Sequence, residues 1–90
     1  MVMISDLLYQ LAGSSMAERE LADELRTDVS IVQQCLQQLG KLEIVNGPVG
    51  TDRQWTAVPE DAPFDVMVTK AKAGGVNVRD TLPAFVARAS

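Results

Sequence analysis

The stretch ELADELRTDVSIVQQCLQQL, residues 20–39, decides the fold that we expect for this chain. Its first part has apolar residues at helical spacing, at Leu21, Ala22 and Leu25. After a short polar break, Asp28 is a suitable N-cap residue. The apolar residues then fall at spacings of four and three, at Val32, Leu36 and Leu39. The pattern predicts two amphipathic helices, over about residues 16–25 and 29–41, joined by a tight turn.

The segment before this stretch predicts another amphipathic helix, over residues 2–12. Its apolar residues lie on one face, at Ile4, Leu7, Leu8 and Leu11. The sequence Ser15-Met16-Ala17-Glu18 then has the pattern of a capping box, in which the Ser15 hydroxyl accepts from the N3 amide and Glu18 reaches back. We therefore expect this box to open the second helix and Glu18 to face water.

The segment after residue 42 predicts a β-hairpin. Residues 43–46 and 53–58 have strand-like composition, and turn-forming residues fill the seven positions 46–52 between them. Trp55 is the one tryptophan of the chain, and a lone indole on a strand usually closes a small core. We expect helices again over residues 64–73 and from about residue 81 to 88, after a proline-containing linker.

Helix, capped helix, tight turn, longer helix and hairpin follow one another in the order of a winged helix domain. Residues 20–39, with Trp55-Thr56-Ala57-Val58 as the last strand, resemble the winged helix-turn-helix superfamily of small bacterial or phage-type regulators. The resemblance covers about residues 4–58. It implies a mainly α (α+β) fold, with three helices plus a two-stranded wing. The chain departs from the family at Arg26 and Glu43, where glycine is common.

The layout is also similar to that of small winged helix proteins of the ferrous iron transport system, including Leu36-Gln37-Gln38-Leu39. Those proteins carry a cysteine cluster in the wing, and this wing has no cysteine. No iron function is therefore carried over to this chain.

The expected organisation is a winged helix domain over residues 1–58, a linker over 59–63 and a short helical C-terminal extension over 64–90. The apolar-faced segments of the extension are too short to be stable alone. They must pack on the winged domain or on a second copy of the chain. Our hypothesis is that they build a homodimer.

The resemblance implies a small DNA-binding transcriptional regulator, in which the third helix enters the major groove and the wing supports it. Glutamine can pair with adenine through two hydrogen bonds, and basic residues contact phosphates. The candidate contacts to double-stranded DNA are Ser30, Gln33, Gln34, Gln37, Lys41 and Arg53. The outer stripe of this helix is also compatible with an ordinary solvated helix surface, and it consists of Ser30, Gln33, Gln34, Gln37, Gln38 and Lys41.

The charge of the chain favours an alternative, a winged helix protein–protein interaction module or adaptor that does not bind DNA. The net charge is −4, and residues 1–60 hold nine acids against four bases. DNA affinity depends strongly on phosphate neutralisation, which so few bases supply poorly. For this alternative we expect an acidic face on the second helix and the turn after it, which consists of Glu18, Glu20, Asp23, Glu24 and Asp28. The face could bind a basic partner or mimic the phosphates of DNA.

Several classes of function are not supported by the sequence. The chain has one cysteine, Cys35, and no histidine, which leaves no pattern for an internal disulfide or a metal site. No phosphate-binding loop or nucleophile motif is present, so we expect no enzyme activity and no cofactor. Without a signal peptide or an apolar run of about 20 residues, we expect a cytoplasmic protein that does not contact a membrane.

Overall fold

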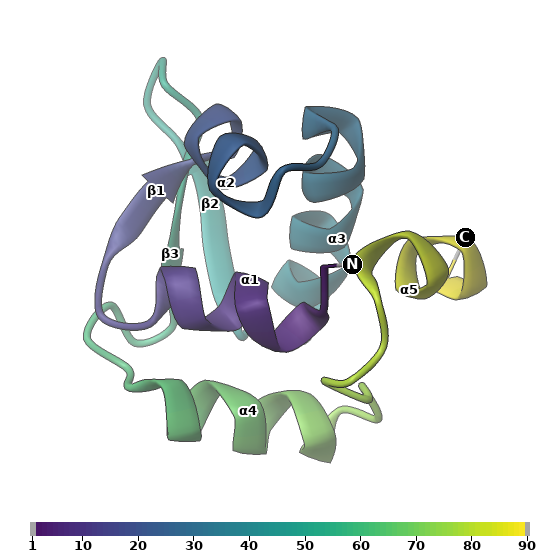
Figure 1. Ribbon diagram of the computed structural model, residues 1–90. Coiled ribbons are helices and arrows are strands. Elements are labelled where there is room, and N and C mark those ends of the chain that lie inside the picture. The colour runs from purple at the N-terminus through teal and green to yellow at the C-terminus, as the bar shows by residue number, and fades with distance from the viewer. Residues whose placement is uncertain (1, 90) are drawn as a thin grey trace.

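The computed structural model describes residues 2–89 and shows a small α+β fold (Figure 1). This part of the chain contains five helices: α1 (Ile4–Leu11), α2 (Glu18–Leu25), α3 (Val29–Lys41), α4 (Phe64–Ala73) and α5 (Leu82–Ala89). It also contains three strands: β1 (Ser15–Ala17), β2 (Val45–Val49) and β3 (Gln54–Ala57). The strands form one antiparallel sheet in the order β1-β3-β2.

The helices α1 and α3 lie where the apolar spacing predicted them. The inner face of α3 is buried at Val32, Cys35, Leu36 and Leu39. The α2–α3 connection is the three-residue segment 26–28, and Arg26 adopts a left-handed conformation there with φ 54°. Asp28 occupies the N-cap position of α3, although its side chain makes no capping hydrogen bond.

The predicted capping box at Ser15 is wrong, and so is the prediction of only two strands. Residues 15–17 form β1, whose Ser15 and Met16 pair with Thr56 and Trp55 of β3. The second helix therefore begins at Glu18, whose amide donates to the carbonyl of Arg53 at 3.2 Å. Pairing with a strand nearly 40 residues later overrides the local capping signal.

The predicted hairpin is present, with shifted strand limits. Glu43 lies outside both strands, in a left-handed conformation with φ 59°. Trp55 is buried, as predicted for a residue that closes the core. Gly47 of β2 lies so close to β3 that a Cβ there would be 2.7 Å from the Gln54 carbonyl oxygen and 2.9 Å from Cδ2 of Trp55. Only glycine fits at this contact.

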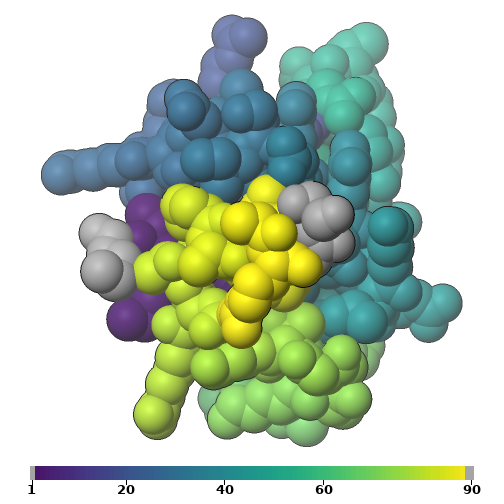
Figure 2. All heavy atoms as spheres, turned by 90° about the vertical axis from the view of Figure 1, so that its right-hand side faces the viewer, coloured from purple at the N-terminus to yellow at the C-terminus, as the bar shows by residue number. Residues whose placement is uncertain are grey.

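The C-terminal helices complete the core of the same chain. The helix α4 packs against α1, and α5 packs against α3. Figure 2 shows α5 in the middle of one face, between α4 and the α2–α3 region. Met67, Ala71 and Leu82 are fully buried in the cluster that also contains the α1 and α3 side chains. The packing partner that the apolar segments require is therefore found within the chain.

The start of α1 also depends on the C-terminal region. The amides of Ile4 and Ser5 donate to the carbonyls of Asp80 and Val78, at 2.9 and 3.0 Å. The first amides of a helix have no partner inside that helix. Residues 78–80 supply those partners, so this region belongs to the same folding unit as α1.

Candidate binding surface

One side of α3 is exposed to solvent. We call it the outer face of α3, and it consists of Ser30, Gln34, Gln37 and Lys41. All four were candidate contacts to DNA, and the structure brings them together on one side of the helix. Gln33, a fifth candidate, is half-buried at one edge of this face. Gln38 was expected on the outer stripe but is half-buried, and its Oε1 atom is buried without a hydrogen-bond partner.

Arg53, the candidate contact on the predicted wing, forms an ion pair within the chain. Its Nε atom donates to Oε1 of Glu18 in an ion pair between the loop before β3 and the first residue of α2. The Arg53 side chain is 50% exposed, whereas that of Glu18 is 3% exposed. The prediction that Glu18 faces water is wrong, because the β1–β3 pairing brings it against the loop between β2 and β3. The carboxylate neutralises the charge that Arg53 would bring to a phosphate.

An open groove of about 610 Å³ lies between α2, the first half of α3 and the loop between β2 and β3. We call it the acidic groove, and its lining consists of Ala17, Glu18, Arg19, Glu20, Asp23, Val29, Gln33, Thr51, Asp52 and Arg53. Four carboxylates against two guanidinium groups give it a formal charge of −2. Because Val29 and Gln33 belong to its wall, this negative charge lies directly beside the outer face of α3.

The acidic patch predicted from the sequence is only partly reproduced. Glu20 and Asp23 are exposed and line the acidic groove, while Glu24 and Asp28 are exposed outside its lining. Asp52 also lines the groove, although its sequence context indicated only a turn residue. No local signal could have found it, since the loop between β2 and β3 reaches α2 only through the pairing of β1 with β3.

Three basic residues of the C-terminal region, Lys70, Lys72 and Arg88, are paired within the chain or lie on α4. Lys70 donates from Nζ to the carbonyl of Val58, and Arg88 forms an ion pair with Asp80. Figure 1 shows α4, which carries Lys70 and Lys72, at the opposite end of the molecule from the loop between β2 and β3. Their positive charges therefore lie away from the surface where DNA was expected.

The groups suited to catalysis or metal binding are sparse in the described residues. Cys35 is a free, buried thiol, and burial raises its pKa to about 12. A thiol with that pKa stays protonated at neutral pH, which suits a core residue and not a nucleophile. Within residues 2–89, no group of three or more Cys, Asp or Glu side chains is arranged to hold a metal ion.

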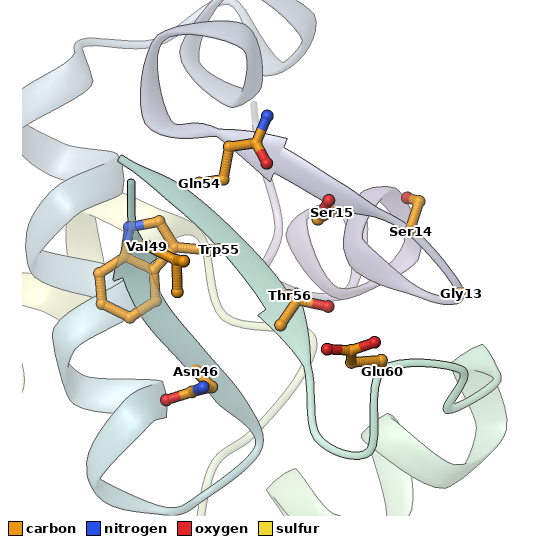
Figure 3. Close-up of a pocket in the computed structure, with 9 residues that line it drawn as sticks. All are labelled: Gly13, Ser14, Ser15, Asn46, Val49, Gln54, Trp55, Thr56 and Glu60. Atoms are coloured by element: carbon orange, nitrogen blue, oxygen red, sulfur yellow. The ribbon is translucent and has the colours of Figure 1, made fainter. Parts of the chain in front are cut away.

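A second hollow, of about 410 Å³, lies on the open face of the sheet (Figure 3). Ser15 and Thr56 lie side by side there on the paired strands β1 and β3, and Glu60 points toward Thr56. Glu60 is the one ionisable residue in the lining of this hollow. The hollow therefore lacks the paired ionisable groups that acid–base chemistry uses.

Among residues 2–89, no helix has the length and apolar character that crossing a membrane demands. No known protein family matches the chain, and neither a curated protein nor a solved structure shows significant similarity to it.

Proposed function

We propose that residues 4–57 form a winged helix-turn-helix. Two observations support this. A three-residue connection joins α2 to α3, as in helix-turn-helix units. The β2–β3 hairpin follows directly, and its loop lines the acidic groove together with the first turn of α3.

We further propose that the chain is a protein-interaction module or adaptor, without enzymatic activity, that contacts its partner through the outer face of α3 and the acidic groove. The observation that carries this proposal is the negative groove beside α3, where a DNA-binding protein needs positive charge. A duplex on α3 would bring phosphates toward Glu20, Asp23 and Asp52. Such contacts oppose the neutralisation on which DNA affinity rests.

Site-specific photo-crosslinking in cells tests the proposal. A photoreactive residue replaces Gln37 on the outer face of α3, and in a control variant it replaces Lys72, which is exposed on α4. We expect a crosslinked product from position 37 that survives nuclease and is destroyed by protease. Absence of that product from position 72 shows that the contact is specific to α3. A position-37 product that nuclease removes contradicts the proposal.

A second candidate, a small DNA-binding transcriptional regulator, is favoured by a different observation. Residues 29–41 contain no acid, and the outer face of α3 ends in Lys41. Glutamine and serine side chains of this face have the donors and acceptors that read base edges. This candidate requires Arg53 to leave Glu18 and contact the duplex, and it predicts binding that weakens steeply with salt.

A further inference from the structure

The carboxylate of Glu18 is incompletely satisfied. Its Oε1 atom accepts from Arg53, whereas Oε2 is buried without a hydrogen-bond partner in the described part of the chain. The residue as a whole is only 2% exposed and belongs to the lining of the acidic groove. A buried carboxylate oxygen without a donor is unfavourable, so a ligand that supplies a donor there gains from satisfying it.

We propose, on the basis of the protein-interaction function above, that the acidic groove binds an arginine side chain on a basic segment of the partner protein. The partner's guanidinium donates to both Glu18 oxygens in a bidentate pair. In the free protein, Arg53 occupies one of these oxygens and is thus an internal competitor of the partner's arginine.

The ion pair between Arg53 and Glu18 shows which kind of donor the Glu18 carboxylate binds. Its donor is a guanidinium nitrogen, and planar guanidinium groups match both oxygens of a carboxylate. An ammonium group is a point donor and lacks this match. Because the Arg53 side chain is half-exposed, it is the member of the pair that can turn into solvent and give up its place.

The rest of the groove suits the residues that flank such an arginine. Glu20, Asp23 and Asp52 are exposed and line the same groove, so further basic side chains meet negative charge on both the α2 side and the wing side. Such charge complementarity steers association and selects against acidic partners. A nucleic acid would meet the same carboxylates with like charge.

Fluorescence anisotropy with a short labelled arginine-rich peptide tests the proposal, with a lysine peptide of equal length and charge as comparison. The wild-type protein should bind the arginine peptide more tightly. Glu18→Gln should weaken binding of the arginine peptide by about tenfold, since the bidentate charged pair is lost. Circular dichroism of each variant establishes that it is folded.

The proposal that Arg53 competes with the partner's arginine for Glu18 is tested by removing Arg53. Arg53→Gln should raise affinity for the arginine peptide by about three- to fivefold, the effect expected when a half-exposed ion pair is released. Arg19→Gln is the matched control, because it removes one positive charge from the same groove without touching Glu18. An equal gain from both variants, or a loss from Arg53→Gln, overturns the competitor role.

The position of the groove is tested by two double variants of equal charge. Asp23→Asn with Asp52→Asn removes two groove carboxylates, whereas Glu24→Gln with Asp28→Asn removes two exposed carboxylates outside its lining. Only the first pair should weaken binding strongly. Equal binding of the two peptides, or equal effects of the two double variants, overturns the arginine site. The crosslink at position 37 tests the proposed function independently of this result.

Discussion

The helices α2 and α3 are neighbours in the fold, but their first residues are positioned by different forces. Asp28 precedes α3 after a polar break, and α3 begins at Val29 as the local sequence predicts. Before α2, an equally good local signal at Ser15 is overridden because β1 pairs with β3. The difference shows that strand pairing, and not capping, brings Glu18 against the loop between β2 and β3 and creates the acidic groove.

If strand pairing positions α2, the largest loss of stability is expected from a substitution of Trp55 on β3. The residue lies on β3 opposite Met16 of β1 and belongs to the buried core. Trp55→Ala should lower the free energy of unfolding by about 3–5 kcal/mol, because it removes a large buried side chain. Chemical denaturation followed by circular dichroism measures this, with Gln34→Ala at an exposed position of α3 as control. A loss no larger than the control's would contradict the role of β3 as the anchor of the sheet.

A smaller effect is expected at Gly47, where β2 approaches β3. Gly47→Ala introduces a Cβ 2.7 Å from the Gln54 carbonyl oxygen, at a φ of +153° that disfavours other residues. Overpacking of this kind costs about 1–3 kcal/mol. Gly50→Ala, at positive φ but with open space around its Cβ, is the control for backbone strain alone. Equal melting temperatures of the two variants would mean that the contact with β3 is not tight.

Substitution of Arg26, the C-cap residue of α2, by glycine should increase stability. It adopts φ 54°, a conformation that glycine tolerates and other residues avoid. Arg26→Gly should therefore raise the free energy of unfolding by about 0.5–1 kcal/mol, after the entropy of glycine in the unfolded chain is counted. Glu43→Gly, at φ 59°, should act in the same direction. Destabilisation by both changes would show that these side chains make contacts that outweigh the strain.

The smallest effects concern the two helix starts themselves. Asp28→Ala should cost about 0.3–1 kcal/mol, since a negative charge next to the first turn of α3 interacts with the helix dipole. Ser15→Ala should cost less than Asp28→Ala, because Ser15 lies in β1 and caps no helix. Thermal denaturation of the two variants ranks them. The opposite ranking would restore the capping box that the sequence suggested.

The sequence predicted the parts of the fold that depend on neighbouring residues. The helical spacing at Val32, Leu36 and Leu39 predicted α3 and placed Gln34 and Gln37 on its exposed side, although Gln33 and Gln38 are half-buried. The burial of Glu18 could not be predicted, because a charged residue in a capping pattern ordinarily faces water. The acidic groove could not be predicted for a different reason, because Asp23 and Asp52 come to line one groove only through the tertiary structure.

The central claim, that this surface serves a protein partner and not DNA, is tested most directly by titrating a fluorescent mixed-sequence duplex with the protein across a salt series. The account predicts no saturable binding at low salt, where phosphate contacts are strongest. Saturable binding whose affinity falls steeply with salt, and which Lys41→Gln weakens, would contradict it.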